Sequence, residues 1–432
     1  MIRTLIAGLR AHGVQQGDCV LVHLPGSVSL SLTAIDLRPL TGRQIIYPLL
    51  NLAIIGAGGV YMGSNPRSQP YELEHIIDLA EPRLVITSPD ALRMTLDAAA
   101  TRGMAPSQIH VLDEFATSQL MGLASSPWAD LSQFFLPTGS HVETPRSVAE
   151  LLLHGQNDWV SFDDEGTAKA TPATMFSTSG TSGLPKAAIN SHHALISQHL
   201  AFNADAPYEI TRLISLPMFH ISGALYYQIF PVRYGQPLYI LPRFEPTQFM
   251  FKVYQFQATE TLLVPPMVHA INQYPTIAKQ LLLSSLRYVA VGAAPIGPGA
   301  VQQLRAMLAP QARAAQMWGM TEIGIVTQSR HGQDVDMASI GSANPGWEIR
   351  LLGADGSPVV GDERPGEMQV RGPGLLSGYK GRTDAVEPDG WFATGDVAYV
   401  KNGCYYLVGR SKELIKVRGC VLPPYSHRYS IP

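Results

Sequence analysis

The sequence predicts an α/β fold with largely parallel sheets, followed by a small antiparallel β unit. Three observations support this prediction. The chain has 432 residues, 46% of them hydrophobic, which is enough to bury a large core in two or more domains or subdomains. Strand-like runs alternate with helical runs up to about residue 338. Beyond that point the sequence changes to short strands separated by glycine turns, as in an antiparallel sheet.

The N-terminal segment MIRTLIAGLRAHGVQQGD predicts an amphipathic helix. Its apolar residues Leu5, Ile6, Leu9 and Val14 recur at helical spacing. A secretory signal peptide would instead need a long apolar run that ends in a small-residue cleavage site, and the segment has no such run. We therefore expect this helix to belong to the folded domain.

The most apolar span, residues 45–62, is about as long as a short membrane helix. Its Pro48, Asn51 and glycine cluster favour a buried helix that leads into a strand. Membrane contact is the alternative, because short apolar runs discriminate poorly between the two.

Strand-like runs then recur along the chain at 83–88, 173–179, 211–218, 236–241, 260–266 and 287–294. The segment from 117 to 164 is rich in serine, proline and acidic residues, which is typical of a long surface excursion. Near the C-terminus, Asp355-Gly356 and Asn402-Gly403 are hairpin turn signals. They indicate that the last part of the chain is an antiparallel β unit.

Charge and cysteine content point to a small-molecule partner. The chain has 31 Lys and Arg residues against 34 Asp and Glu, a formal net charge of -3, and neither sign forms a long run. This balance shows no electrostatic footprint for nucleic acid or an anionic membrane. Cys19, Cys404 and Cys420 lie far apart in no metal-ligand spacing. Their spacing fits a reducing compartment and gives no support for thiolate catalysis.

One loop has a composition suited to an anion. The segment FSTSGTSGLPKAAINSHHA, residues 176–194, follows a β-rich run and precedes a helix expected to start near His193. Its backbone amides, its hydroxyls and Lys186 could hold a phosphate. The spacing differs from the GxxxxGK[ST] of a Walker loop, so a different phosphate cradle is indicated. Taken alone, a flexible polar linker would explain the same composition.

Six ordered motifs decide between these alternatives. STSGTSGLPKA, LPMFHISG, VGAAPI, MWGMTEIG, GWFATGDVAY and GRSKELIKVRG resemble the core motifs of the adenylate-forming enzymes. That superfamily includes acyl-CoA synthetases, 4-coumarate-CoA ligases, beetle luciferases and the adenylation domains of peptide synthetases. The resemblance covers nearly all of residues 1–420, and its wording is closest to the 4-coumarate-CoA ligase-like branch. It implies the large N-terminal domain of these enzymes, with two stacked αβαβα sheet subdomains and a small antiparallel β-barrel-like subdomain.

The implied reaction joins a carboxylate to the α-phosphate of ATP and expels pyrophosphate, a transfer that depends on positioning and charge neutralisation. By resemblance, the residues that hold the β- and γ-phosphates are Thr178, Ser179, Gly180, Thr181, Ser182, Gly183 and Lys186. Lys186 also counts among the predicted catalytic residues.

The motif MWGMTEIG is similar to the family's nucleotide-binding segment. The resemblance gives Trp318 an aromatic face for adenine, Thr321 a hydrogen bond to the α-phosphate and Glu322 the Mg²⁺ that bridges the phosphates. Gly319 and Met320 complete this segment, and Thr321 and Glu322 are also predicted to be catalytic. The family more often has Tyr or Phe at the position of Trp318, so stacking is expected to persist in a pocket of altered shape. Taken alone, a Trp beside a Gly is more typical of an ordinary core.

Three further motifs complete the predicted site. By resemblance, Asp396 accepts hydrogen bonds from both ribose hydroxyls, and Arg410 approaches the ribose or a phosphate. His220 is placed beside the acyl carboxylate, where it stabilises the anion and gates the pocket, although a His in an apolar run is also typical of a core. The residues that let adenine or the acyl chain approach the backbone are Gly292, Ala293 and Ala294.

The resemblance also implies a domain organisation. We expect an AMP-binding domain over residues 1–409, with the β subdomain at about 338–409, and a hinge motif with a divergent tail over residues 410–432. The family's C-terminal domain, which carries a lysine for adenylation, is expected to be absent. On that expectation acyl-AMP forms slowly and acyl-CoA scarcely at all.

The predicted function is that of an acyl-CoA ligase, which uses Mg²⁺ as cofactor, ATP and CoA as co-substrates and a carboxylic acid as substrate. A luciferase-like or carrier-loading adenylating enzyme and an inactive nucleotide or acyl binder are the alternatives. Aromatic acids and medium-chain fatty acids both stay open. Without a signal peptide or a C-terminal peroxisomal tripeptide, a cytoplasmic protein with no membrane span is expected. The oligomeric state stays open.

Overall fold

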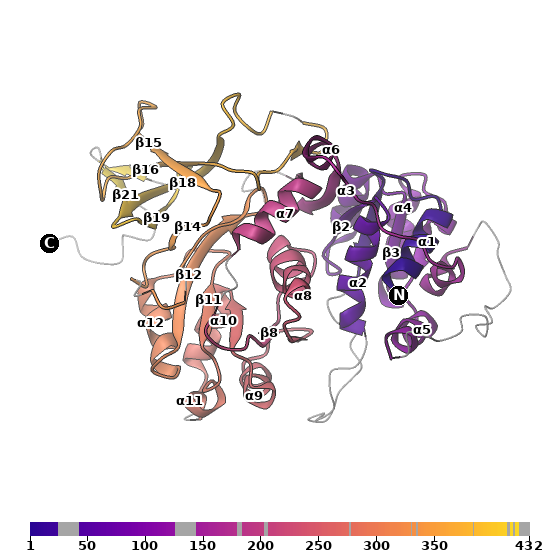
Figure 1. The fold of residues 1–432 in the computed structure, drawn as a ribbon, viewed down its shortest axis with the longest axis horizontal. Coiled ribbons are helices and arrows are strands. Elements are labelled where there is room, and N and C mark those ends of the chain that lie inside the picture. The colour runs from indigo at the N-terminus through magenta and orange to yellow at the C-terminus, as the bar shows by residue number, and fades with distance from the viewer. Residues whose placement is uncertain are drawn as a thin grey trace.

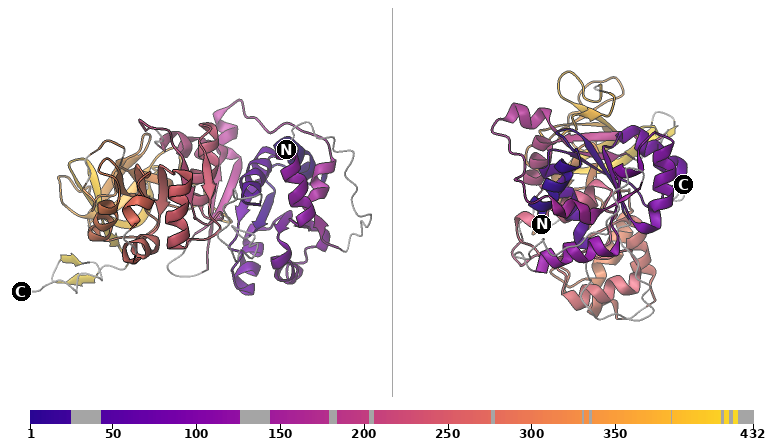
Figure 2. Two further views of the ribbon diagram at one scale, coloured as in Figure 1. Left: turned by 90° about the horizontal axis from the view of Figure 1, so that it is seen from below. Right: turned by 90° about the vertical axis from the view of Figure 1, so that its right-hand side faces the viewer.

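The computed structural model describes residues 1–24, 43–125, 144–178, 184–202, 206–275, 278–329, 331–333, 336–382, 384–412, 415–417 and 420–422. These residues form three sheets, the helices that cover them and a short terminal hairpin (Figure 1). The two larger sheets carry most of the helices, and the third sheet lies at one end of the molecule (Figure 2). The predicted α/β fold is confirmed.

The first sheet has eight strands in the order β17-β7-β6-β2-β1-β3-β4-β5. The strands are β1 (Cys19–His23), β2 (Val60–Gly63), β3 (Leu84–Thr87), β4 (Ile109–Val111), β5 (Arg146–Ser147), β6 (Pro172–Ser177), β7 (Ala187–Ser191) and β17 (Gly378–Tyr379). β1 to β6 pair in parallel, whereas β7 and β17 run antiparallel to their neighbours. Its helices are α1 (Ile2–Ala11), α2 (Arg43–Gly56), α3 (Pro70–Ala80), α4 (Leu92–Ala100), α5 (Glu114–Ser125), η4 (Val148–Leu153), α6 (Glu165–Ala170) and α7 (His192–Ala201).

Strand β1 shows that this sheet is buried on both faces. All five of its residues are buried. Val20 and Val22 belong to one apolar core and Leu21 to another, because successive side chains of a strand point to opposite faces. Helices α3 and α4 supply residues to the second core, including Leu73 and Ala98. A parallel sheet with both faces covered explains why these strands are apolar throughout.

The second sheet has seven strands in the order β14-β13-β12-β11-β10-β8-β9. The strands are β8 (Arg212–Ile214), β9 (Leu238–Ile240), β10 (Glu260–Leu263), β11 (Tyr288–Val291), β12 (Arg313–Met320), β13 (Gly324–Gln328) and β14 (Ser342–Ala343). Its helices are η5 (Ser222–Ile229), α8 (Phe230–Arg233), α9 (Pro246–Phe256), α10 (Pro265–Gln273), α11 (Lys279–Leu282) and α12 (Pro298–Met307). β8 to β12 pair in parallel, so the carboxyl ends of these strands lie at one edge.

The third sheet is antiparallel and open. It contains β15 (Glu348–Leu352), β16 (Gly366–Arg371), β18 (Phe392–Lys401) and β19 (Cys404–Arg410) in that order, and β20 (Ile415–Val417) pairs with β21 (Cys420–Leu422) apart from it. The expected barrel-like subdomain is therefore wrong in detail, because β15 and β19 are the two edges of this sheet within the described chain. The hairpin at Asn402-Gly403 is confirmed, since both residues have positive φ, 51° and 74°, as a type I′ turn requires.

The structure confirms some of the predictions for the N-terminal segments and contradicts others. Helix α1 and the passage from α2 into β2 agree with the predictions for the first 62 residues. The surface excursion expected from Thr117 to Asp164 is wrong over part of its length, because α5 and η4 occupy it and Leu151 is fully buried. No helix among the described residues has the length and apolarity needed to cross a membrane.

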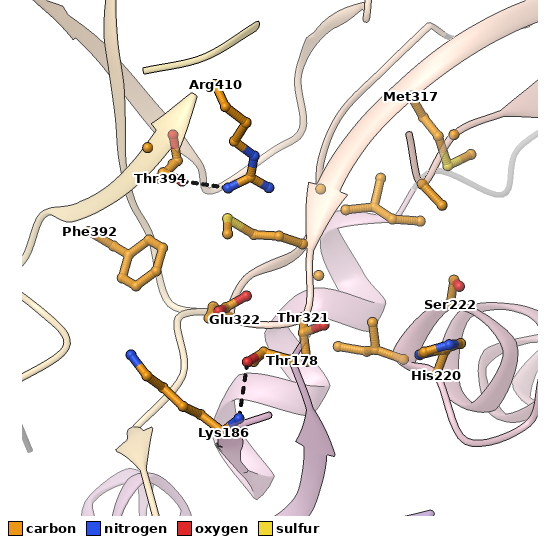
Figure 3. Close-up of a pocket in the computed structure, with 18 of the residues that line it drawn as sticks. Thr178, Lys186, His220, Ser222, Met317, Thr321, Glu322, Phe392, Thr394 and Arg410 are labelled. Carbon is orange, nitrogen blue, oxygen red and sulfur yellow. Dashed lines mark hydrogen bonds between the residues drawn. The ribbon is translucent and has the colours of Figure 1, made fainter. Parts of the chain in front are cut away.

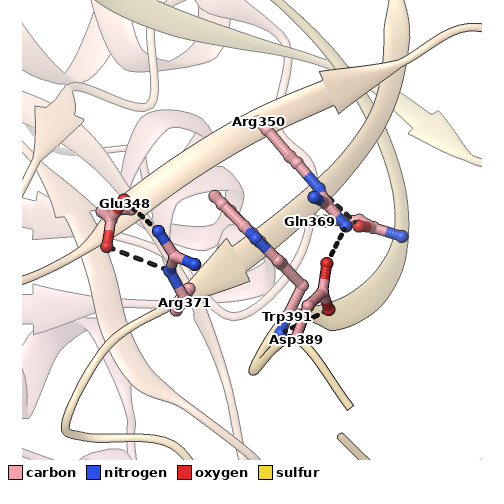
Figure 4. A network of polar contacts seen from close by, with 6 residues as sticks. All are labelled: Glu348, Arg350, Gln369, Arg371, Asp389 and Trp391. Atoms are coloured by element: carbon pink, nitrogen blue, oxygen red, sulfur yellow. Dashed lines mark hydrogen bonds and ion pairs between the residues drawn. The ribbon is translucent and has the colours of Figure 1, made fainter. Parts of the chain in front are cut away.

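An aromatic ring between two arginines stabilises the surface of the third sheet (Figure 4). The guanidinium carbons of Arg350 and Arg371 lie 4.3 and 4.7 Å from the centre of the Trp391 ring. Arg371 forms a two-pronged pair with Glu348 at 3.0 and 2.7 Å, and Arg350 contacts Asp389 at 3.3 Å. Because each guanidinium has a carboxylate partner, this surface is a self-contained ionic network.

Three histidines form a chain at the surface of the first sheet. His110 Nε2 lies 2.9 Å from His12 Nδ1, and His12 Nε2 lies 3.3 Å from His154 Nε2. Burial lowers the pKa of His110 to about 3 and that of His12 to about 4, and the neighbouring Arg146 adds to both shifts. Both rings are therefore neutral near pH 7.

We expect the protein to lose stability in mild acid. Unfolded histidines have a pKa near 6.5, so the unfolded chain binds protons first as the pH falls. The contribution of the neutral rings is complete above about pH 6.5 and is lost as the pH falls to about 4 for His12 and about 3 for His110, with a slope of at most about 1.4 kcal/mol per pH unit for each ring. Urea unfolding at pH 7.5 and 5.0 measures this loss. His110→Phe should lose less stability over that interval, and an equal loss in both proteins would contradict the assignment.

Candidate active site

A cavity of about 730 Å³ lies where the three sheets meet. Its wall includes the carboxyl ends of β10 and β11, the turn between β12 and β13, the segment that leads into η5, and residues of β17, β18 and β19. In open α/β sheets, ligands bind outside the carboxyl ends of the parallel strands. The cavity also has the volume of a small-molecule site.

The structure brings many predicted site residues to this wall. Those that line the cavity are Thr178, Lys186, His220, Gly292, Ala293, Gly319, Met320, Thr321, Glu322 and Arg410. Ala294, Trp318 and Asp396 are not among the lining residues. The predicted phosphate-binding residues Ser179, Gly180, Thr181, Ser182 and Gly183 lie outside the described residues.

Thr178 and Lys186 hold the two ends of the predicted phosphate loop together. The Thr178 amide donates to the Lys186 carbonyl at 2.8 Å, and the Lys186 amide donates to Thr178 Oγ1 at 3.4 Å (Figure 3). The prediction of a helix that starts near His193 is confirmed, because α7 starts at His192; the strand β7 that precedes it was not predicted. Strands β6 and β7, on either side of the predicted loop, pair antiparallel, and β7 precedes α7.

Glu322 lies at the centre of the polar end of the cavity. Its side chain is only 7% exposed, and the Tyr379 hydroxyl donates to Oε1 at 2.8 Å. The Lys186 Nζ atom lies 4.9 Å from the centre of the Tyr379 ring. Thr321, the neighbour of Glu322, also lines the cavity. Three chain segments thus bring a cation, a carboxylate and hydroxyl groups into one wall.

The oxygen atoms at this end suit a hard cation. Glu322 supplies a carboxylate and Thr321 a hydroxyl, and Mg²⁺ prefers oxygen ligands. Among the described residues, no three His, Cys, Asp or Glu side chains are grouped so that they could hold a metal ion by themselves. A cation here would therefore depend on oxygens supplied by a ligand, as Mg²⁺ does when it binds with phosphates.

Asp396 is buried behind the cavity wall. It is 4% exposed, accepts from the Trp318 indole N–H at 2.9 Å and pairs with Arg410 Nε at 2.8 Å. Trp318 is 7% exposed and packs in the core beneath the third sheet. The indole N–H of Trp318 therefore holds the Asp396 carboxylate, and the stacking of adenine on the Trp318 ring stays a prediction. Arg410 still lines the cavity beside this pair.

Two glycines allow the tight turn that carries Thr321 and Glu322. A Cβ atom on Gly319 would lie 1.9 Å from the Gly324 carbonyl oxygen, which no side chain permits. Gly324 itself has a φ of +68°, the left-handed region that glycine enters without strain. Both glycines are therefore required by the backbone of the turn.

The segment after β11 combines close packing with a strained residue. A Cβ on Gly292 would lie 3.0 Å from the Met317 side chain, so a larger residue here would have to displace Met317 of β12 slightly. Ala293 has a φ of +73°, which is unfavourable for a residue with a side chain and recurs at ligand sites. Because Ala293 lines the cavity, this strained backbone forms part of the cavity wall.

His220 begins the apolar end of the cavity. The protein atoms around its ring lower the pKa of the imidazole below its ordinary value by desolvation. Beyond His220 the wall consists mainly of apolar or neutral side chains, among them Leu216, Ser222, Tyr226, Leu262, Val264, Met317 and Ile325. A neutral imidazole therefore stands between a polar end and an end suited to an uncharged organic group.

Two cavity tyrosines were missed by sequence reasoning. Tyr226 is fully buried, and its hydroxyl oxygen accepts from the Ile325 amide at 2.9 Å. Tyr379 reaches Glu322 from β17, far along the chain. Tyr226 lies six residues after His220, so the His220 motif could have drawn attention to it; no local signal connects Tyr379 with Glu322.

Comparisons with known proteins agree with this geometry. The family described as AMP-binding enzyme matches residues 41–380. The chain is 42% identical over 429 residues to a nicotinic acid-CoA ligase of Penicillium canescens, covering 98% of the chain and 74% of that protein. It is 43% identical over 434 residues to a nicotinic acid-CoA ligase of Aspergillus fumigatus, covering 98% and 70%. An acyl-CoA ligase of Aspergillus oryzae is 44% identical over 439 residues, with coverage of 98% and 74%.

Solved structures show the same fold. ATP-bound MatB from Rhodopseudomonas palustris superposes with a TM-score of 0.76 at 23% identity and covers 98% of this chain and 75% of its own. A luciferase-like enzyme from the mealworm Zophobas morio gives a TM-score of 0.72 at 20% identity, with coverage of 96% and 88%. These structures support the architecture alone.

The role of Asp396 can be separated from the role of its neighbours. If Asp396 binds ribose, Asp396→Ala should weaken ATP binding by about 1.5 to 3 kcal/mol, because a charge-assisted hydrogen bond is lost. Trp318→Phe removes one hydrogen bond to Asp396 but keeps the carboxylate, so its effect on ATP binding should be much smaller. Calorimetric titration measures both, and thermal unfolding checks the fold. Equal effects of the two substitutions would assign Asp396 a purely structural role.

Proposed function

Because the chain belongs to the AMP-binding enzyme family, we propose that it activates a small aromatic or heteroaromatic carboxylic acid with ATP and transfers the acyl group to CoA. The relatives of this chain are named CoA ligases, which are acid-thiol ligases. ATP and CoA are the co-substrates that fit this enzyme class. The observation that carries the proposal is one cavity wall that combines Lys186, Thr321 and Glu322 with an apolar end beside His220.

The first half-reaction needs two anions to meet. An oxygen of the carboxylate attacks the α-phosphorus of ATP, an acyl-AMP anhydride forms, and the bond to pyrophosphate breaks. Lys186 is proposed to neutralise the departing phosphates, and Thr321 to donate to the α-phosphate. Glu322 would hold Mg²⁺, which supplies charge neutralisation for the phosphates when it is bound. In the second half-reaction, the CoA sulfur attacks the acyl carbon, AMP leaves, and the thiol proton passes to solvent.

His220 is proposed to orient the acid. A neutral imidazole donates one hydrogen bond to the carboxylate and does not lock it in a salt bridge. The attacking oxygen then stays available to the α-phosphorus. The lowered pKa of His220 supports this role, because the ring is neutral near pH 7.

The relatives and Tyr226 together favour an acid with a ring acceptor. Two relatives are named nicotinic acid-CoA ligases, and nicotinic acid carries a ring nitrogen that accepts a hydrogen bond. The Ile325 amide occupies one lone pair of the Tyr226 oxygen, which leaves the phenolic proton for an acceptor in the cavity. We therefore propose that Tyr226 donates to the ring of the bound acid. Medium-chain fatty acids, which offer no such acceptor, are the alternative tested below.

The test compares nicotinate, benzoate and octanoate by ATP-pyrophosphate exchange, with CoA thioesters followed by mass spectrometry. We expect kcat/KM to be highest for nicotinate. In Tyr226→Phe, the preference for nicotinate over benzoate should fall by about 10- to 100-fold, the worth of a hydrogen bond to a buried acceptor.

The ratio of the two acids is the internal control. Phe also removes the acceptor of the Ile325 amide, but that loss affects nicotinate and benzoate alike. An unchanged ratio would limit Tyr226 to supporting Ile325. A higher kcat/KM for octanoate than for either ring acid would refute the aromatic substrate class.

A further inference from the structure

One segment of the third subdomain returns to the first sheet. Between β16 and β18, residues 376–380 run along the first sheet, and Gly378 and Tyr379 among them form β17, which pairs with β7. The Leu376 amide donates to the Glu322 carbonyl at 2.9 Å, and the Ser377 amide to the Ile189 carbonyl at 2.8 Å. The Lys380 amide donates to the Ala187 carbonyl at 2.9 Å. Residues 376–380, which we call the strap, therefore contact both the turn that carries Glu322 and the strand β7 that follows Lys186.

Tyr379 lies in the middle of this strap and faces the cavity. Its hydroxyl donates to Glu322 Oε1 at 2.8 Å, and its ring lies 4.9 Å from Lys186 Nζ. A phenol has an ordinary pKa near 10, so the hydroxyl keeps its proton near pH 7 and can donate to the carboxylate. One side chain thus contacts both the carboxylate and the cation at the polar end of the site.

We propose that Tyr379 is a positioning residue that aims Glu322 at a divalent cation and Lys186 at the triphosphate. The inference rests on the proposed function, because it assumes that this end of the cavity binds Mg-ATP. Tying Oε1 to a neutral donor leaves the negative charge of Glu322 intact and its other oxygen for the cation. The ring restricts a long, otherwise exposed lysine side chain through a cation–π contact.

Two substitutions separate these two effects. Tyr379→Phe removes only the hydroxyl and keeps the ring beneath Lys186, whereas Tyr379→Leu removes both. Calorimetric titration with ATP, with and without MgCl₂, gives the gain in affinity that Mg²⁺ provides. We expect Tyr379→Phe to reduce that gain by about tenfold or more and to leave metal-free ATP binding unchanged. Tyr379→Leu should in addition weaken metal-free ATP binding by about two- to fivefold.

A double-substitution cycle identifies Glu322 as the group through which the hydroxyl acts. Glu322→Gln should remove the Mg²⁺ gain, and adding Tyr379→Phe to it should cause little further loss. Tyr399→Phe is the matched control, because this ring stacks on Tyr406 in the third sheet, outside the cavity wall, and its removal of a hydroxyl should leave ATP binding unchanged.

Three outcomes would overturn the proposal. A full Mg²⁺ gain in Tyr379→Phe would leave the tyrosine a structural role alone. Additive losses in the double variant would show that the hydroxyl acts independently of Glu322. Failure of the unmodified chain to bind Mg-ATP would refute the proposed function itself, and that result is distinguishable because it does not depend on any substitution at Tyr379.

Discussion

The apolar core between the first two sheets fixes the geometry of the whole site. Val22 and Phe176 of the first sheet share this core with Ala290 and Met317 of the second. The Tyr61 hydroxyl reaches across it to the Met218 carbonyl at 3.1 Å, directly before the segment that carries His220. Such cores are packed as densely as organic crystals and do not deform continuously. The core therefore fixes the first sheet, which Lys186 precedes at β7, relative to the turn of the second sheet that carries Glu322.

The two buried carboxylates at the cavity, Asp396 behind its wall and Glu322 within it, have different kinds of partner. Asp396 is paired with Arg410 and receives the Trp318 N–H, so its charge is neutralised. Glu322 receives a hydrogen bond from the uncharged Tyr379 hydroxyl. A buried charge needs hydrogen bonds to offset its lost hydration, and a neutral donor provides one without cancelling the charge. The charge of Asp396 is therefore balanced by a cation of the protein, whereas the charge of Glu322 is not balanced by its Tyr379 contact.

The sequence predicted the fold class, the alternation of elements and ten residues of the cavity wall, because these depend on local periodicity and on motifs whose order is visible in one chain. Thr178, Lys186, His220, Thr321 and Glu322 are brought together as expected. The strand β7 was missed because it is short and follows directly on a loop rich in glycine. The indole N–H of Trp318 donates to Asp396, which lies 78 residues further along the chain. No local sequence pattern predicts such a contact. Tyr379 was missed for the same reason, because its partner Glu322 lies 57 residues away in the sequence.

The two ends of the cavity differ in polarity, and this difference favours one orientation of a bound organic acid. Lys186, Arg410 and Lys412 line one part of the wall, while the wall beyond His220 is apolar or neutral. Figure 3 shows Thr321 between the side of Glu322 and Lys186 and the side of His220 and Ser222. An organic acid loses least hydration energy when its ring enters the neutral end and its carboxylate stops at this boundary. A triphosphate is favoured at the opposite end, where cations offset its charge. On the function proposed above, the two reacting groups meet beside Thr321, and the distribution of charge along the wall sets where the bond forms.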